Sequence, residues 1–421
     1  MIILAGRGED FSAGHDLGTP EEKEDALAKK ARTNRWEQEM SNNKPPTRRQ
    51  VLQGTAGTLA LATLGGCANA LKPKTGMYQR PLSRKPFVAP RISHDRIVRV
   101  ITGLRPYRPQ GFVVKKEQYD NKTLIHNYGH GGGGISLSWG SSALALHELA
   151  GMEPGKAAVI GSGIMGLTSA RLLQDAGWEV TIYSRDASRH STSNVGAGQW
   201  APTSVFEEGV ATKTFEEQYK YAARIAHHAY QNLSGAGYGI SFHENYYLGT
   251  EPAEESYYLR ELPELFTSVA NLAPHEHPFP VPYAKRVVSM MIQPAIFLRR
   301  IRSDFYLAGG KLVVQNFSDL SEILSLNEST IFNCTGLGAK DLFDDEDLIP
   351  IKGQLVLMQP DPAVDYLTIG GGPGVTYMFP RKGEILLGGS YQRNDWTRHA
   401  EPGVTDRIIA NHQALFDNMK L

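Results

Sequence analysis

A run of glycines near residue 130 carries the clearest chemical meaning in this sequence. Residues 126–136 read His-Asn-Tyr-Gly-His-Gly-Gly-Gly-Gly-Ile-Ser. Because glycine has no side chain, such a run lets the backbone come close to a flat ligand. His126 and His130 have the four-residue spacing of a metal-binding pair on a helix. The neighbouring glycines disfavour a helix there, so we expect no metal site.

A second glycine-rich segment has the spacing of a dinucleotide-binding loop. Gly161, Gly163 and Gly166 follow a buried strand expected at 157–160 and precede a helix expected at 167–176. The three glycines serve a tight turn, a close backbone approach to pyrophosphate, and helix–strand packing. Amide groups at the helix N-terminus then favour the anion. An ordinary strand–helix turn is the alternative, and the flanking strand and helix patterns favour the nucleotide.

The loop alone does not choose between FAD and NAD. After the second strand, expected at 180–183, the chain reads Ser184-Arg185-Asp186. Asp186 is the nearby acid that could bind the ribose hydroxyls, and Arg185 could equally meet a phosphate. The choice of cofactor therefore depends on other segments.

Three segments together resemble the D-amino-acid oxidase family of FAD-dependent enzymes. They are the glycine run, Gly-Leu-Arg-Pro-Tyr-Arg-Pro at 103–109, and His-Ser-Thr-Ser-Asn-Val-Gly-Ala-Gly-Gln-Trp at 190–200. The last is similar to the family stretch that passes the FAD diphosphate and then the flavin, so the resemblance implies FAD. The glycine run comes last in that family and precedes the phosphate loop here. The sequence is therefore predicted to be circularly permuted over about 93–421.

The resemblance assigns the cofactor to residues from several segments. The expected FAD contacts are Gly131, Gly133, Gly134, Ile135, Ser136, Gly161, Gly163, Ile164, Met165, Gly166, Ser184, Arg185, Ser191, Thr192, Ala197, Gly198, Gln199, Val314 and Thr335. The hydroxyls of Ser191 and Thr192 can donate to phosphate, and the backbone of Val314 matches a position that meets adenine. Cys334 is expected to be a packed small residue and not a nucleophile.

Four residues are expected on the substrate side, also by resemblance. Arg105 matches the carboxylate clamp of the family, a role that suits a planar guanidinium because it makes two parallel bonds. Tyr377 and Tyr391 match active-site tyrosines, the second from the yeast branch, and the carbonyl of Gly132 matches the acceptor for the substrate amine. A surface ion pair for the arginine and half-buried packing for the tyrosines are the alternatives. Pro373 stands where mammalian enzymes have a further tyrosine, which leaves the lid and the side-chain specificity open.

The reaction that the resemblance implies is oxidative deamination of a D-amino acid. Hydride passes from the α-carbon to flavin N5 without a protein base, and the imine is hydrolysed to a keto acid. Catalysis would come from alignment of the substrate, with the redox step supplied by the cofactor and oxygen reduced to peroxide. The alternatives are a sarcosine/glycine-type amine oxidase, a flavin dehydrogenase with a respiratory acceptor, or a lipid-anchored flavoprotein without turnover. Arg105, Tyr377 and Tyr391 argue against the last.

The fold class predicted is α/β. We expect a Rossmann-like FAD-binding domain and an α+β substrate domain on a mostly antiparallel sheet. The expected segments are the FAD domain at 93–202 (93–150 and 156–202), mainly substrate domain at 203–300, an FAD-domain return at 301–348, and substrate-domain strands with a C-terminal helix at 349–421. Since permutation requires neighbouring ends, the strand expected at 97–102 should lie near that helix, which is expected from about Asp406.

Composition fits a soluble globular enzyme. The 421 residues carry no formal net charge, with 41% hydrophobic and 21% charged residues, so neither a nucleic acid nor an anionic membrane surface is expected as a partner. Cys67 and Cys334 are too few for a disulfide framework. No apolar stretch has the length of a mature transmembrane helix.

The N-terminal region resembles an export signal. Residues 40–67 contain Arg48-Arg49, an uncharged apolar run, and a lipobox-like end at Cys67, which is similar to a twin-arginine lipoprotein signal. The alternative is an accidental arginine pair before a glycine- and alanine-rich linker. A start at Met40 would place the protein in the periplasm or on a membrane by lipidation. A start at Met1 would leave it in the cytoplasm.

Two further N-terminal segments have no expected activity. Residues 1–39 include a short stretch within 1–20 that looks like a fragment of an enoyl-CoA hydratase, and we interpret them as a mis-assigned start or a fusion remnant. Residues 68–92 are rich in Lys, Pro and Arg and are expected to be a tether.

Overall fold

The computed structural model describes residues 86–186, 191–252 and 255–421. All of these belong to one compact unit of the chain. The segment predicted as an export signal, the segment before it, and most of the predicted tether lie outside the described residues. Among the described residues, no helix is both long enough and apolar enough to cross a membrane.

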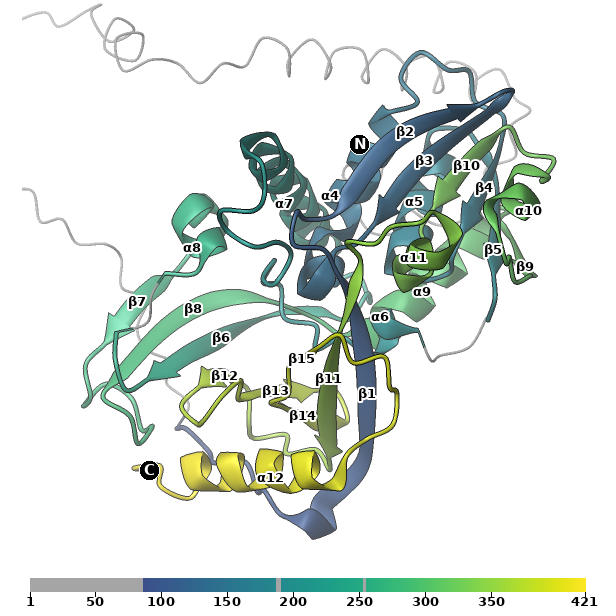
Figure 1. Ribbon diagram of the computed structural model, residues 1–421. Coiled ribbons are helices and arrows are strands. Elements are labelled where there is room, and N and C mark those ends of the chain that lie inside the picture. Colours follow the sequence, from purple (N-terminus) through teal and green to yellow (C-terminus); the bar gives the residue numbers. More distant parts are fainter. Residues whose placement is uncertain (1–85, 187–190, 253–254) are drawn as a thin grey trace, which may run out of the picture. The chain divides into compact units, whose positions relative to one another are not determined.

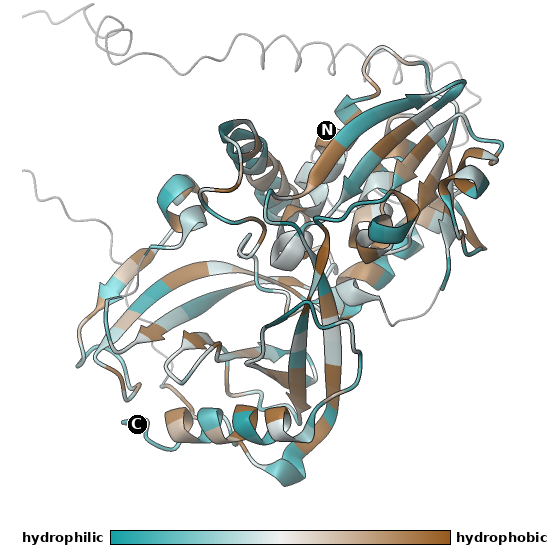
Figure 2. Ribbon diagram, in the orientation of Figure 1, coloured by the Kyte–Doolittle hydropathy of each residue, from teal (hydrophilic) through white to brown (hydrophobic). Residues whose placement is uncertain are grey.

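The first sheet has the parallel core of a nucleotide-binding domain (Figure 1). Its order is β2 (Val113–Tyr119), β3 (Lys122–Tyr128), β10 (Thr330–Asn333), β4 (Lys156–Ile160), β5 (Glu179–Ser184), β9 (Lys311–Val314). Only β2 runs antiparallel to its neighbour. Strands of a parallel sheet are covered on both faces, and Figure 2 accordingly shows hydrophobic residues along β3 and β4 and hydrophilic ones over most of the edge strand β2.

Helices pack on this sheet and on one another. They are α4 (Gly134–His147), α5 (Ile164–Asp175), α7 (Lys213–Leu233) and α9 (Pro294–Leu307). α5 contacts α4 and α9, and α7 lies along α4. The contact between α4 and α7 is close, because a Cβ at Gly140 would lie 1.8 Å from the carbonyl oxygen of Ala222.

The second sheet is mostly antiparallel. Its order is β1 (Ile97–Tyr107), β11 (Ile349–Met358), β14 (Glu384–Gly388), β13 (Tyr377–Arg381), β12 (Leu367–Gly370), β6 (Ile240–Gly249), β8 (Tyr283–Ile292), β7 (Val269–Leu272), with β15 (Gln392–Arg393) beside β11. Only β12 and β6 pair in parallel. The predicted α/β class with a second, mainly antiparallel sheet is confirmed.

Short elements join these layers. They are the helices α6 (Thr192–Val195), α8 (Tyr257–Glu261), α10 (Leu320–Leu324) and α11 (Ala339–Leu342), and the 3-10 turns His94–Arg96, Gly131–Gly133, Pro263–Leu265 and Gly336–Gly338. The last helix, α12 (Pro402–Phe416), covers one face of the second sheet beside β11 and β14 (Figure 1).

The start of the described chain lies against its C-terminal helix. Ile97 and Val100 pack on the cluster that contains Ile408, and the Gln413 amide donates to the carbonyl of Ile92 at 3.0 Å. The predicted proximity of the first strand and the last helix is therefore confirmed.

The predicted tether at 68–92 is wrong for its last residues. Phe87 makes edge contacts with the rings of Tyr246, Phe279 and Tyr366 at 5.2–5.6 Å, and Ile92 is buried. Two apolar side chains in a segment otherwise rich in Pro, Arg and Lys are enough to seat it on the second core.

Candidate active site

A cavity of about 890 Å³ runs between the ends of the first sheet and one face of the second. Of the residues predicted for cofactor and substrate, all but three line it. The three are Gly133, Gly166 and Val314. Gly133 faces Val205, Gly166 packs on the backbone of Gly161, and Val314 is exposed next to Gln315, which does line the cavity.

The phosphate loop follows β4 and precedes α5. Gly161 has a positive φ of 110°, and a Cβ there would lie 2.5 Å from the carbonyl oxygen of Cys334. A Cβ at Gly166 would lie 1.8 Å from the oxygen of Gly161. Only glycine fits either position, so the loop can hold the N-terminus of α5 against the sheet and leave its amides toward the cavity.

Hydroxyl groups surround the start of α5. The Ile164 amide donates to Ser193 Oγ at 3.0 Å, and Ser162 and Ser184 share a hydrogen bond of 2.8 Å. Thr192 Oγ1 donates to the carbonyl of Leu104 at 3.1 Å. The hydroxyl of Thr192 thus joins α6 to β1, a packing role that the resemblance did not indicate.

The far end of the loop is closed by the residues after β10. The Thr335 amide and hydroxyl both donate to Asn333 Oδ1, at 3.1 and 2.7 Å. Cys334 is buried, and burial raises the pKa of its thiol to about 12. A thiol this difficult to ionise is a packing group and not a nucleophile, as expected.

Several lining residues were missed by the sequence analysis. They are the loop 315–318 after β9 and the residues Asp341 and Leu342 of α11. The signal available was the position of β9, since a parallel sheet gathers its ligand-binding loops at the carboxyl ends of its strands. That β9 neighbours β5 could not be read from the sequence.

The glycine run forms the turn between β3 and α4. The Gly132 amide donates to the carbonyl of Ser204 at 2.9 Å. His130 is stacked on Phe112 at 4.6 Å, and burial lowers its pKa to about 3, so its ring is neutral. Within the described ranges, no group of three or more His, Cys, Asp or Glu side chains could hold a metal ion.

Arg105 projects over a glycine on the neighbouring strand. β1 and β11 pair so that Gly103 faces Gly353 and Arg105 faces Ile351. A Cβ at Gly353 would lie 2.6 Å from Arg105 Nη1. This buried Nη1 has no hydrogen-bond partner among the described residues, which argues against a surface ion pair. A partly buried guanidinium with one buried, unpaired nitrogen beside a cavity is suited to an anionic ligand.

Tyr377 lies over a second glycine. It pairs with Gly388 across β13 and β14, and a Cβ at Gly388 would lie 2.0 Å from Tyr377 Cζ. The Tyr377 side chain is almost buried, whereas Tyr391 is 42% exposed at the cavity. Two glycines on adjacent strands therefore make room for the arginine and the tyrosine on one face of the sheet.

Arg108, the other arginine of the Arg-Pro segment, has a structural position. Its Nε lies 2.8 Å from Asp345, whose carboxylate also accepts from Tyr128 at 2.8 Å. The pair is mostly buried and connects β1 to the chain after α11. Arg108 therefore has a structural role, in contrast to Arg105.

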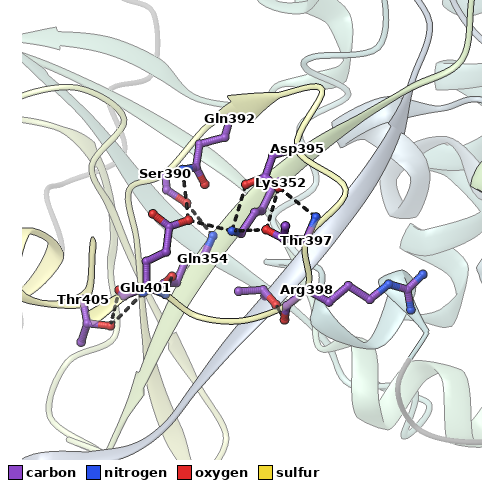
Figure 3. A network of polar contacts seen from close by, with 10 residues as sticks. Lys352, Gln354, Ser390, Gln392, Asp395, Thr397, Arg398, Glu401 and Thr405 are labelled. Atoms are coloured by element: carbon purple, nitrogen blue, oxygen red, sulfur yellow. Dashed lines mark hydrogen bonds and ion pairs between the residues drawn. The ribbon is translucent and has the colours of Figure 1, made fainter. Parts of the chain in front are cut away.

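A polar network behind β11 holds the segment that carries Tyr391 (Figure 3). The fully buried Lys352 donates to Asp395, Thr397 and Glu401 at 3.0, 2.8 and 2.7 Å. Burial opposes the charge on Lys352, but the hydrogen bonds that Lys352 donates to the two carboxylates, together with their negative charges, outweigh burial and raise its pKa. The backbone N–H of Gln354 donates to Ser390 Oγ at 2.6 Å, and Ser390 is the residue before Tyr391.

A family model described as FAD dependent oxidoreductase (DAO) matches residues 156–420. The chain belongs to this family. The family is FAD-dependent, so the predictions of an oxidoreductase and of FAD as its cofactor are confirmed. The glycine cradle and the hydroxyls around the start of α5 fit a dinucleotide of this kind.

Individual relatives are similar to the chain at low identity. A D-amino-acid oxidase of Streptomyces coelicolor is 26% identical over 276 residues, which cover 64% of this chain and 80% of the relative. A D-aspartate oxidase of Homo sapiens is 26% identical over 268 residues, covering 63% and 76%. Among solved structures, a glycine oxidase from Geobacillus kaustophilus has 16% identity and a TM-score of 0.49, covering 62% of this chain and 78% of that one.

Proposed function

We propose that this enzyme oxidatively deaminates a D-amino acid. The observation that carries the proposal is the guanidinium of Arg105, which lies at the cavity with a buried and unpaired Nη1. An amino acid substrate brings the carboxylate that such a group lacks, and a planar fork fixes the direction of that carboxylate. The names of the curated relatives support the same substrate class.

The residues would act by orientation. Arg105 would hold the carboxylate. Tyr377 on β13 and Tyr391, in the connection between β14 and β15, would line the substrate site, and the carbonyl of Gly132 would accept a hydrogen bond from the amine. FAD, held by the glycine cradle, by Ser191 and by the backbone of Ala197, Gly198 and Gln199, supplies the hydride acceptor. The protein's contribution to the rate is then alignment of the α-hydrogen, with no side chain required as a base.

Anaerobic flavin reduction tests this proposal. The purified yellow protein is mixed with D-alanine, L-alanine, D-aspartate, glycine or sarcosine, and the visible absorbance of the flavin is followed. We expect D-isomers to bleach the flavin and their L-partners to leave it oxidised. Bleaching by glycine or sarcosine alone would replace the proposal with an amine oxidase. A flavin that none of them reduces would favour a protein without turnover.

The electron acceptor is tested in the same cuvette. We propose that oxygen reoxidises the reduced flavin and yields hydrogen peroxide. Readmitting air should restore the absorbance and produce peroxide in proportion to the substrate consumed. Slow recovery in air, with fast recovery on adding a quinone, would identify a dehydrogenase with a respiratory acceptor.

We also propose that the chain is a circular permutant of its family. The family match begins at β4, yet β1 and β3 before it are built into the two sheets. The two ends of the described chain lie close enough to be joined. The Tyr366 hydroxyl donates to the carbonyl of Val88 at 2.9 Å and lies 3.7 Å from Met419 Sδ. A rearranged chain that runs from 156 to 421 and then from 86 to 150 should fold and bind FAD. Failure of that chain to fold would count against permutation.

For localisation, we propose twin-arginine export and lipidation at Cys67 when translation starts at Met40. The support is the order of the three sequence elements in 40–67. Mass spectrometry of the protein from its native cells would show a lipidated N-terminal cysteine. A protein that begins at residue 1 or 40 without lipid would refute the anchor.

A further inference from the structure

Arg381 connects the substrate sheet to the segment that would face the flavin. It is the last residue of β13, and its side chain is only 7% exposed. Its Nη2 donates to the carbonyls of Gly196 and Ala197, the second at 2.7 Å. Its Nη1 donates to Glu384 at 3.2 Å. A buried guanidinium thus donates two hydrogen bonds to consecutive main-chain carbonyls of another segment.

Residues 196–198, which we call the flavin-facing segment, are held from two other sides. A Cβ at Gly196 would lie 2.7 Å from the Ile135 side chain at the start of α4, and a Cβ at Gly198 would lie 2.1 Å from the Ile292 carbonyl. The Ile292 amide donates back to the carbonyl of Gly198 at 2.7 Å. Ile135 and Ile292 restrict the segment on these two sides, and the hydrogen bonds from Arg381 restrict its backbone on a third.

The strand that carries Arg381 also carries the substrate tyrosine. Tyr377, Phe379 and Arg381 alternate along β13 and therefore project from the same face of the sheet. Tyr377 and Phe379 line the cavity, as do Gly196 and Ala197. One short strand therefore sets the position of Tyr377 and, four residues later, the position of the flavin-facing segment.

We propose that Arg381 is a positioning residue that fixes the flavin relative to the substrate, by clamping the carbonyls of Gly196 and Ala197 to the strand of Tyr377. The inference rests on the cofactor roles given to Ala197 and Gly198 above. Loss of the clamp should loosen FAD and misalign it, because hydrogen bonds from a buried charged group are the strong ones, and because reaction rates depend steeply on alignment.

The test uses the full chain with Arg381→Met, Arg381→Lys and a matched control, Arg99→Met. Arg99 pairs with the same Glu384, at 3.4 Å, but is exposed and does not contact the flavin-facing segment. The FAD-free protein is titrated with FAD while tryptophan fluorescence is followed. We expect Arg381→Met to weaken FAD binding about tenfold or more, Arg381→Lys to be intermediate, and Arg99→Met to stay within about twofold.

A second measurement separates positioning from general damage. With FAD at saturation, Arg381→Met should lower the limiting rate of anaerobic flavin reduction while the substrate KM changes little, since Arg105 and Tyr377 are untouched. Wild-type FAD affinity together with a wild-type limiting rate in Arg381→Met would overturn the proposal. If that variant does not fold, the same result in a folded Arg381→Lys overturns it.

The proposed function and the clamp fail differently. A wild-type protein that binds FAD but is not reduced by any D-amino acid refutes the substrate proposal, and the FAD titration still decides on Arg381. A wild-type protein that does not bind FAD refutes the cofactor site, and with it the clamp.

Discussion

Single residues determine what this cavity can bind. The glycines that leave space beside Arg105 and Tyr377 matter as much as those two side chains. Arg105 has room only because Gly353 lies diagonal to it on β11, and Tyr377 has room only because Gly388 lies across from it on β14. The sequence pointed to the arginine and the tyrosine through their local contexts. It could not point to the two glycines, because each contact depends on strand register. Gly353 requires the register of β1 with the distant strand β11, and Gly388 requires the register of β13 with β14.

Removing the guanidinium should weaken substrate binding. For Arg105→Ala we expect the substrate KM to rise by a factor of about 30 or more, which corresponds to a loss of about 2–5 kcal/mol for truncating one member of a buried charge pair. Arg105→Lys should lie between this variant and wild type, because an ammonium gives no bidentate contact. Steady-state kinetics measure the effect, and unchanged KM values would remove Arg105 from the site.

Filling the space under Tyr377 should damage catalysis without removing the cofactor. A Cβ at Gly388 would overlap the tyrosine ring, at 2.0 Å from Cζ, so Gly388→Ala must displace the ring. We expect kcat/KM to fall by about a hundredfold, with FAD retained on a desalting column. The control is Gly155→Ala, where a Cβ meets nothing within 4 Å. Equal activity in the two variants would contradict the role of Tyr377.

At the scale of elements, the sequence predicted those whose signal is local. The strand, loop and helix expected at 157–176 agree closely with β4 and α5. The first strand was expected to end at Thr102 and continues to Tyr107. Pro106 is tolerated there because β1 is the edge of its sheet, where a missing amide proton leaves no neighbour unpaired.

Helix α4, in contrast, depends on packing that the local sequence does not indicate. It begins at Gly134, within the glycine run, although glycine is a poor helix former. Packing against α5 and α7 outweighs that propensity, and Gly140 is needed for the close approach to Ala222. The sequence holds no local sign of a contact with a helix some eighty residues away.

The Lys352 network should stabilise the segment that carries Tyr391. Lys352→Met removes a buried ammonium and leaves Asp395 and Glu401 without their common partner. Because both carboxylates are partly exposed, we expect a loss of about 1–3 kcal/mol in the free energy of unfolding. Thermal or urea unfolding measures it. A variant as stable as wild type would show that water replaces the lysine.

The same network predicts a dependence on pH. Hydrogen bonds from Thr397 and then from Lys352 lower the pKa of Asp395 to about 2, and the Lys352 ammonium lowers the pKa of Glu401. A depressed carboxyl pKa contributes stability above its unfolded value, near 4, and loses it as pH falls through the folded value. The stability advantage of wild type over Lys352→Met should therefore be full above about pH 5 and shrink toward pH 2. An advantage that does not change with pH would contradict this.

At the scale of the whole molecule, residues 86–92 belong to the folded enzyme. Phe87 lies among three aromatic rings and Ile92 is buried beside α12. A chain that starts at 93 should therefore be less stable than one that starts at 86, by about 2–4 kcal/mol for the loss of the two apolar side chains. Comparing their melting temperatures at equal FAD concentration tests this, because bound cofactor also raises stability. Identical melting temperatures would show that residues 86–92 do not contribute to stability, as expected of a tether.

The pairing of β1 with β11 has a consequence for synthesis of the chain on the ribosome. β1 and the β2–β3 pair are made early, but β10, the second neighbour of β3, begins only at residue 330, and β11, the partner of β1, begins only at residue 349. Both sheets therefore wait with open edges until most of the chain has emerged. Unpaired edges of this kind attract other strands, so nascent chains stalled before residue 349 should aggregate or recruit chaperones. The order of segments in the finished fold thus leaves its first strand, β1, without a partner until β11 has been made.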